Sequence, residues 1–344
     1  MMSRLRALLT GLFGLTAGLA LAGPAQAQTD TLASVQDRGY LRCGINPFQQ
    51  GMAVEDGGRW LGMGPDLCRA FAAATLGDPN AVTFVPVTAR TRFPALQSGE
   101  IDVLVRTTTW TFTRDTALGA DFIGPYYVES ERILVRRDSG LTEFEDLDGQ
   151  PICTIAGSLT EAVMQNQEQA AGIDIQTIPV ADTVQYREAY QAGRCIGVTD
   201  GQAGLTALRA LMDDPDAHAF INGRMAVSPL SIAVRHGDDH WEDIIRWTFN
   251  ALATAEELGV TQTNVQRLST QSRHPIIRRL INPEGGSGAA LGLESDWAFR
   301  ALQAVGNLGE IYDRAFGEGS ELVIPRGPSA LWRDGGMVVT APFE

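Results

Sequence analysis

Four threonines and one arginine follow a short apolar run and could together hold a small anion. The threonines are Thr107, Thr108, Thr109 and Thr111, and the arginine is Arg114. Each hydroxyl both donates and accepts hydrogen bonds, and a planar guanidinium suits a carboxylate held by two parallel hydrogen bonds. No nucleophile–base pair accompanies these residues. The segment therefore predicts a site that binds an anion, not a catalytic centre.

The elements before these threonines should place them at the edge of a sheet. A helix that ends near Gln97 is closed by Gly99, and residues 101–105 form an apolar run of strand length. We expect the threonines to lie on a loop at the carboxyl end of this strand, where α/β proteins bind small ligands.

The second half of the chain echoes the first. ALQSGEIDVLV (residues 95–105) and AYQAGRCIGVT (residues 189–199) both read as a helix, a glycine turn and a strand, followed by polar residues. We therefore expect two α/β lobes with a ligand cleft between them. Residues 28–130 should begin the first lobe, 131–226 should form the second, and 227–344 should return to the first.

The remaining predicted elements continue this alternation. Asp238 should begin a long helix in which Trp241 and Trp247 face the core. Helices near residues 295–305 and 310–316 should form a C-terminal extension on the first lobe. Further helices are expected at 31–38, 65–75 and 184–192, strands at 40–45, 82–87, 152–155, 175–180, 195–198 and 231–235, and a polar loop at 46–59.

The first 27 residues have the layout of a cleaved secretory signal peptide. Arg4 and Arg6 precede an apolar stretch at residues 7–22, and Ala25 and Ala27 form a small-x-small cleavage site. This stretch is short for a membrane span. No cysteine follows it that would carry a lipid. We therefore expect a free periplasmic protein, exported by a signal peptide that is then removed.

The composition excludes several classes of function. The formal net charge of −14 becomes −16 once Arg4 and Arg6 are removed, and the chain holds no basic run. Nucleic acid and anionic membrane surfaces are therefore not expected as partners. All 27 residues counted as Lys or Arg are arginine, which excludes Schiff-base chemistry and P-loop phosphate binding. We expect no cofactor.

Four cysteines in an exported chain indicate two disulfides, for which three connectivities exist. We expect Cys43 to pair with Cys68, and Cys153 with Cys195, each pair within one lobe. A metal site is not expected, because no two cysteines have C-x₂-C spacing and the histidines are scattered. The one pair four residues apart, at positions 236 and 240, flanks a predicted turn and helix cap.

Several segments together resemble one family of proteins. They are residues 93–122, AGSLTE (156–161), AGRC (192–195), VRHGDDHW with the helix that follows (234–260) and AVGNLGEIYDRAFG (304–317). They resemble the periplasmic amino-acid-binding proteins of ABC importers, specifically the long general L-amino-acid-binding subgroup, over essentially the whole mature chain. The resemblance implies a two-lobe, type II periplasmic-binding-protein fold that closes on its ligand and docks on a membrane permease.

In the first lobe, the resemblance assigns the ligand carboxylate to Arg114 and small hydroxyl contacts to Thr107 and Thr109. It places an aromatic ring over the ligand near Phe48. Arg92 lies on the packed face of its helix, and we interpret it as a scaffold residue.

The second lobe departs from the family pattern at positions that face the ligand. Ser158 is followed by a leucine where the family has two threonines, and Thr160 could substitute in part. The aspartate that grips the ligand ammonium would fall on Gly201, whereas Asp200 comes one residue early. A shift of one residue in a strand turns a side chain to the other face. Either the strand end bulges and Asp200 still faces the cleft, or the ammonium site is lost.

These features predict a solute-binding protein that delivers L-amino acids to an ABC importer, not an enzyme. One alternative is a binder of a different small carboxylate, in which the ammonium site has degenerated. Another is a periplasmic dehydratase on the same scaffold, for which Glu161 and Asp200 are the nearby candidates for a general acid or base. A third is a sensing module that passes its ligand state to a separate receptor.

Overall fold

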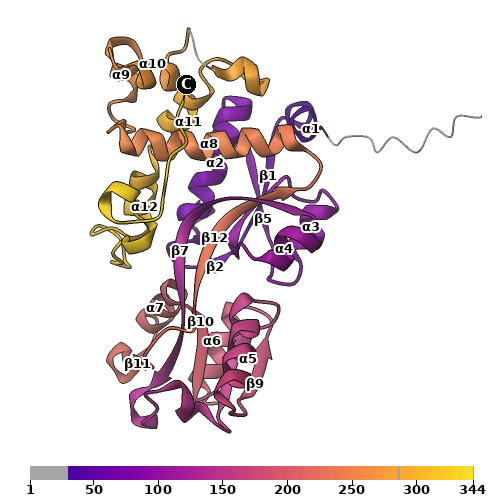
Figure 1. Ribbon diagram of the computed structural model, residues 1–344, viewed down its shortest axis with the longest axis vertical. Coiled ribbons are helices and arrows are strands. Elements are labelled where there is room, and N and C mark those ends of the chain that lie inside the picture. Colours follow the sequence, from indigo (N-terminus) through magenta and orange to yellow (C-terminus); the bar gives the residue numbers. More distant parts are fainter. Residues whose placement is uncertain (1–29, 285–286, 344) are drawn as a thin grey trace, which may run out of the picture.

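The computed structural model describes residues 30–284 and 287–343, so the predicted signal peptide lies outside the described residues. The chain folds into two α/β lobes connected by long strands (Figure 1). The helices are α1 (Thr31–Arg38), α2 (Met63–Leu76), α3 (Arg92–Gln97), α4 (Phe112–Ala117), α5 (Leu159–Ala171), α6 (Thr183–Gln191), α7 (Gln202–Ala210), α8 (Asp239–Glu257), α9 (Val265–Gln271), α10 (Pro275–Ile281), α11 (Trp297–Val305) and α12 (Leu308–Phe316). The strands are β1 (Leu41–Ile45), β2 (Phe48–Gln49), β3 (Ala53–Asp56), β4 (Arg59–Leu61), β5 (Val82–Pro86), β6 (Val103–Thr109), β7 (Ala120–Arg136), β8 (Pro151–Ile155), β9 (Gln176–Val180), β10 (Gly197–Gly201), β11 (His218–Phe220) and β12 (Ala226–Arg235).

One mixed sheet runs through both lobes. Its strand order is β5-β1-β6-β12-β7-β10-β8-β9, and β11 pairs with β7. In the first lobe β1 is parallel to β5 and β6, and in the second lobe β8 is parallel to β9 and β10. Residues at the carboxyl ends of β6 and β10 line one pocket, as the end of a parallel strand is expected to do.

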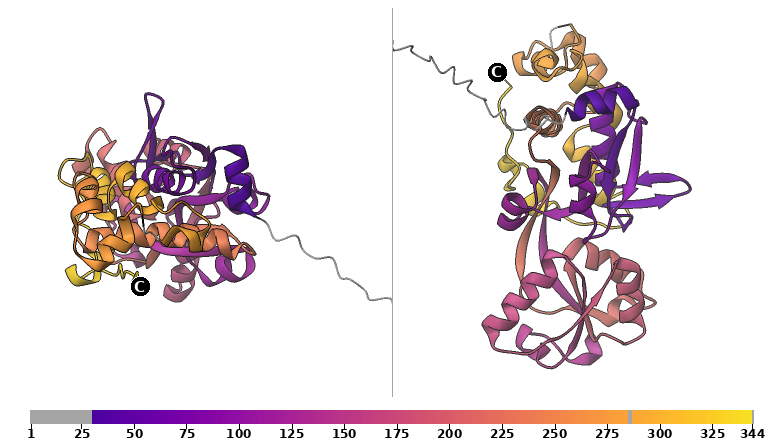
Figure 2. Two further views of the ribbon diagram at one scale, coloured as in Figure 1. Left: turned by 90° about the horizontal axis from the view of Figure 1, so that it is seen from above. Right: turned by 90° about the vertical axis from the view of Figure 1, so that its right-hand side faces the viewer.

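Two antiparallel strands connect the lobes, as Figure 2 shows. The 17-residue strand β7 pairs with β12 from Ala120 to Glu131 and with β10 from Glu131 to Val135. Glu131 is therefore the residue at which β7 passes from one partner strand to the other. The side chains of Glu129 and Glu131 on β7 line the pocket described below.

Each lobe has its own core. Phe71, Trp241 and Trp297 are fully buried in the first lobe, and Tyr186 and Tyr190 are buried in the second. The core position predicted for Trp241 is confirmed. No helix among the described residues is both long and apolar enough to cross a membrane.

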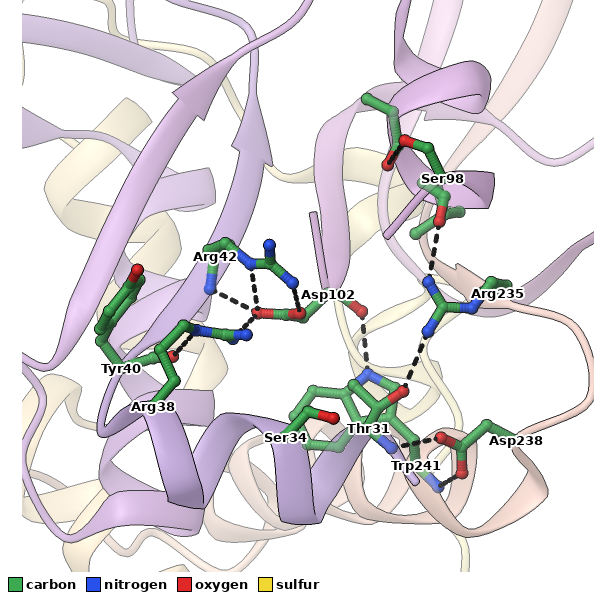
Figure 3. Close-up of polar contacts among 12 residues, drawn as sticks. Thr31, Ser34, Arg38, Tyr40, Arg42, Ser98, Asp102, Arg235, Asp238 and Trp241 are labelled. Atoms are coloured by element: carbon green, nitrogen blue, oxygen red, sulfur yellow. Dashed lines mark hydrogen bonds and ion pairs between the residues drawn. The ribbon is translucent and has the colours of Figure 1, made fainter. Parts of the chain in front are cut away.

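A polar network fastens the N-terminal helix to the first lobe (Figure 3). The carboxylate of Asp102 accepts hydrogen bonds from the backbone and the guanidinium of Arg42, at 2.7 and 2.8 Å, and the Asp102 carbonyl accepts one from the Trp241 indole at 2.9 Å. Asp238 caps α8 and also accepts a hydrogen bond from the N–H of Thr31 at 2.8 Å. Two buried carboxylates thus hold α1, β1 and α8 together.

The C-terminal segment returns to the strand that connects the lobes. The ring of Tyr127 stacks on that of Tyr312, with centroids 6.0 Å apart, and meets Phe316 at 5.4 Å. The hydroxyl of Ser329 accepts a hydrogen bond from the backbone N–H of Val128 at 2.9 Å. The predicted C-terminal extension is therefore present, and it contacts β7 as well as the first lobe.

Both predicted disulfides are present. Cys43–Cys68 joins β1 to α2 with Cα atoms 6.2 Å apart, and Cys153–Cys195 joins β8 to the turn before β10 with Cα atoms 5.6 Å apart. Each bond lies within one lobe.

Two local expectations were wrong. Thr107, Thr108 and Thr109 lie within β6 and not on a loop, because β6 continues as far as its pairing with β12 allows. The segment expected to be a polar loop at 46–59 contains the short strands β2 and β3, and together with β4 they form a separate antiparallel sheet that projects from the first lobe (Figure 2).

Candidate ligand-binding site

A pocket between the lobes, here called the inner pocket, draws its walls from both of them. The first lobe contributes residues of α3, β6 and α4, the second contributes the start of α5 and the end of β10, and β7 contributes two glutamates. Six of the seven predicted site residues line this pocket: Thr107, Thr109, Arg114, Ser158, Thr160 and Asp200.

A larger cavity of about 640 Å³, here called the outer pocket, adjoins the inner pocket. Phe48, the seventh predicted residue, lines this cavity and not the inner pocket, and it is 55% exposed. Apolar walls come from Trp60, Tyr186 and Leu208, among others. The two pockets share Asn46, Gln49, Arg106, Ile155 and Asp200.

Thr107 has an unusual backbone conformation at the end of β6. Its φ is +27°, in the region that non-glycine residues rarely adopt. Its N–H donates a hydrogen bond to the hydroxyl of Tyr126 at 3.1 Å. Such local strain persists only where the surroundings hold it, and it is found preferentially at binding and catalytic sites.

Arg114 is buried at the start of α4 with its guanidinium held in place. One nitrogen donates to the carbonyl of Thr109 at 3.0 Å, and the group lies 6.0 Å from the ring centre of Phe93. Burial lowers the pKa of Arg114 to about 10, and the negative charge of Glu131 opposes that shift. The guanidinium therefore stays charged at neutral pH and faces the inner pocket.

Two further arginines line the inner pocket. Arg106 is buried in β6, and its Nε donates to the carbonyl of Val87 at 2.8 Å. Burial lowers its pKa to about 10. Arg92, which the sequence indicated as a scaffold residue, packs over the Phe93 ring at 5.1 Å but also reaches across to the carbonyl of Gly157 in the second lobe, at 3.5 Å. Sequence reasoning missed the pocket position of both arginines.

The hydroxyls contributed by the second lobe already have partners. Ser158 caps α5 by accepting a hydrogen bond from the N–H of Glu161 at 3.1 Å. The hydroxyl of Thr160 donates to Glu131 at 2.8 Å. The start of α5 nevertheless faces the pocket, and backbone N–H groups at a helix N-terminus attract anions.

Three carboxylates, on Glu129, Glu131 and Asp200, line the pocket on the side of β7 and β10. The two glutamates were missed by sequence reasoning. Burial raises the pKa of Glu129 to about 8 and that of Asp200 to about 7, and it raises the pKa of Glu131 as well. Within residues 30–284 and 287–343, no ion pair joins these carboxylates to the three pocket arginines.

Asp200 faces the cleft without a bulge in its strand. The pairing of β10 with β7 is regular from Gly197 to Gly201, and Asp200 lines both pockets. Its carboxylate accepts a hydrogen bond from the N–H of Gly201 at 2.9 Å. β10 ends at Gly201 and α7 begins directly after it, so Asp200 lies at the end of its strand and beside the pocket.

Glu161, considered as a catalytic acid or base, and the histidines considered as metal ligands form other contacts. The carboxylate of Glu161 accepts a hydrogen bond from the N–H of Gly157 at 2.8 Å and lines neither pocket. His236 pairs with Asp121 at 2.9 Å, and His240 contacts the carbonyl of Leu291 at 3.0 Å. Among the described residues, no group of three or more His, Cys, Asp or Glu could hold a metal ion.

Two lobes, two connecting strands and a charged pocket between them define the architecture of a solute-binding protein. The chain matches the bacterial extracellular solute-binding proteins, family 3, over residues 41–264, and it belongs to that family. It is 39% identical over 333 residues to the glutamate/glutamine/aspartate/asparagine-binding protein BztA of Rhodobacter capsulatus, covering 96% of this chain and 98% of the relative. It is 40% identical over 325 residues to the general L-amino acid-binding periplasmic protein AapJ of Rhizobium johnstonii, covering 94% of this chain and 95% of the relative.

Solved structures share the fold. An ABC transporter/periplasmic binding protein from Brucella ovis with glutathione bound superposes with a TM-score of 0.86 at 40% identity, covering 91% of this chain and 99% of that chain. A cysteine-binding protein from Campylobacter jejuni superposes with a TM-score of 0.58 at 22% identity, covering 67% and 90%, and shows the fold alone.

Proposed function

We propose that this protein binds L-amino acids between its lobes in the periplasm and delivers them to the membrane permease of an ABC importer. Its family is one of extracellular solute-binding proteins. The names of BztA and AapJ, which match this chain over nearly their whole length, record amino-acid binding. The predicted signal peptide would export the chain.

The division of charge in the inner pocket carries this proposal. All three arginines of the pocket come from the first lobe, and all three carboxylates come from β7 and β10. Because no ion pair joins the two groups within the described residues, the guanidinium and carboxyl groups both remain available to a ligand, and a ligand ammonium would favour the ionised form of the carboxyls. An amino acid presents a carboxylate and an ammonium on one carbon atom, which matches such an arrangement. A ligand with only one of these charges would leave the other side of the pocket without a partner.

We assign each predicted residue a contact with the ligand from its position in the two pockets. Arg114 holds the ligand carboxylate, assisted by Thr107 and Thr109 on the same lobe. Ser158 and Thr160 shape the start of α5, whose N–H groups approach the carboxylate from the second lobe. Asp200 accepts a hydrogen bond from the ligand ammonium, and Phe48 covers the ligand side chain from the outer pocket.

We further propose that the lobes move about β7 and β12. In this division residues 28–130 and 227–344 belong to the first lobe with its extension, and 131–226 belong to the second. Contacts from both lobes form together only in the closed state. A ligand therefore shifts the balance toward closure by the difference between its affinities for the two states.

The size of the outer pocket favours a second candidate, a short peptide or conjugate that keeps the amino-acid group at one end. A cavity of about 640 Å³ beyond the inner pocket leaves room for such an extension. The solved structure from Brucella ovis contains glutathione, which has an amino-acid group of this kind. In this version the free amino-acid end occupies the inner pocket and the remainder of the molecule follows the apolar wall.

Calorimetric titration of the purified mature protein with the twenty amino acids and with glutathione tests both candidates. Micromolar or tighter binding of at least one amino acid is expected, and tighter binding of glutathione would favour the second candidate. Binding of neither class would overturn the proposal. We propose that the protein is not an enzyme, and incubation with arogenate or prephenate should therefore yield no aromatic product.

A further inference from the structure

Gly201 and Glu129 occupy adjoining places on the paired strands β10 and β7, and the glycine makes room for the glutamate. A Cβ atom at position 201 would lie 2.4 Å from Cγ and 2.6 Å from Cδ of Glu129. Carbon atoms that are not bonded do not approach so closely. The Glu129 side chain therefore fills the volume that any larger residue at position 201 would require.

One oxygen of the Glu129 carboxylate accepts hydrogen bonds from the protein, and the other has no hydrogen-bond donor among the described residues. Oε1 accepts hydrogen bonds from the N–H groups of Ala203 and Ser130, both at 3.1 Å. Oε2 is buried and has no hydrogen-bond partner among the described residues. The residue is only 4% exposed and lines the inner pocket. An unpartnered carboxylate oxygen in such a place is costly, and a donor from a ligand would remove that cost.

The other two carboxylates of the pocket have more support. Glu131 receives the hydroxyls of Thr160 and Ser228, and the positive charge of Arg114 acts on it. Because both carboxylate oxygens of Glu131 already accept hydrogen bonds from these hydroxyls, we interpret Glu131 as part of the pocket wall.

Asp200 also has a positive neighbour in Arg106, whereas the charges that act on Glu129 are the negative ones of Glu131 and Asp200. Burial and this repulsion together raise the pKa of Glu129. Among the described residues, the hydrogen-bond donors to Glu129 are backbone N–H groups, and its main charged neighbours are Glu131 and Asp200.

We propose that Glu129 is a second acceptor for the ligand ammonium, sharing it with Asp200, and that Gly201 is required because it admits the Glu129 side chain. An ammonium group has three N–H donors, so it can serve two carboxylates at once. This inference rests on the proposed function, and it adds a specificity-determining residue on the connecting strand. It implies selection for a positively charged amino group over the same acid without one.

The test compares three amino acids with their counterparts that lack the α-amino group: L-glutamate with glutarate, L-alanine with propionate, and L-arginine with 5-guanidinovalerate. Calorimetry is performed on the wild type, on Glu129→Gln, and on the exposed-acid control Glu188→Gln in α6. We expect Glu129→Gln to weaken binding of the amino acids at least tenfold, and to change binding of the des-amino acids less than twofold. Glu188→Gln should match the wild type throughout.

A relocated carboxylate separates ligand contact from a structural role. Glu129→Ala vacates the volume beside position 201, so the double variant Glu129→Ala/Gly201→Asp should recover most of the amino-acid affinity that Glu129→Ala loses. Unchanged amino-acid binding by Glu129→Gln, or an equal loss for amino acids and des-amino acids, overturns the inference while the proposed function stands. Failure of the wild type to bind any of the twenty amino acids or glutathione, in the titrations described above, overturns both.

Discussion

The hydroxyl of Ser329 and the amide of Val128 form a hydrogen bond of 2.9 Å across 201 positions of sequence. It joins the C-terminal segment to the strand that connects the lobes, one residue before Glu129. The extension therefore contacts the strand that contributes Glu129 to the inner pocket, as well as the first lobe.

Ser329→Ala should lower the free energy of unfolding by about 1–3 kcal/mol, because it leaves a buried amide without its acceptor. Urea denaturation of the ligand-free protein measures the change. Ser329→Thr, which keeps a hydroxyl at this position, is the matched control. Equal stability of the alanine variant and the wild type would show that the contact does not support β7.

Arg114→Met should weaken amino-acid binding at least tenfold, because the ligand carboxylate loses a charge-assisted, two-point contact. Arg114→Lys keeps the positive charge but lacks the planar fork, so it should recover only part of the affinity. Titration calorimetry gives both values. If the methionine variant binds as tightly as the wild type, Arg114 does not hold the carboxylate.

Asp200→Ala should also weaken amino-acid binding at least tenfold, equivalent to about 1.4 kcal/mol. The carboxylate lines both pockets and faces the predicted position of the ligand ammonium. Unchanged calorimetric affinity in this variant would remove Asp200 from the site.

The buried carboxylates predict a definite pH dependence of stability. Burial raises the pKa of Glu129 to about 8 in the folded protein, well above its ordinary value of 4.5. Between these two values the unfolded chain has released this proton and the folded chain retains it. The contribution of Glu129 to stability is therefore fully present below pH 4.5 and is lost as the pH rises to about 8.

Glu129→Gln removes this dependence, so the stability of the variant relative to the wild type should increase between pH 6 and pH 8. The upper limit is about 1.4 kcal/mol per pH unit for one group. Urea denaturation at the two pH values, without ligand, measures the difference. A constant difference between the two proteins would show that Glu129 does not titrate in this range. Asp200, with a pKa of about 7, also lowers stability as the pH rises, and it does so in both the wild type and the variant.

Local patterns sufficed for much of the fold and for part of the site. The helix over Thr31–Arg38 was predicted with its observed bounds, and both cysteine pairings were correct. Arg114 and the nearby threonines are close in sequence, so their spacing and residue types were enough to predict that they share a site.

The pocket residues that were not predicted from the sequence are harder to recognise, because their positions depend on how distant strands pair. Glu129 and Glu131 are two residues apart in an otherwise largely apolar strand, so they share one face, and that spacing was a usable signal. Arg106 directly follows the apolar run at residues 101–105, and a charged residue in that place was a similar signal. The relation between Gly201 and Glu129 could not be predicted in this way, because it depends on the register of β7 against β10.

The positions of the disulfides bear on how an exported chain matures. The cross-linked cysteines are separated by only 25 and 42 residues, and both pairs precede β12 in the sequence. A polypeptide that emerges amino end first can therefore complete both oxidation steps before its final third has been translocated. The segment that carries Ser329 would then pack against lobes that are already cross-linked internally. Among the described residues, neither disulfide joins one lobe to the other.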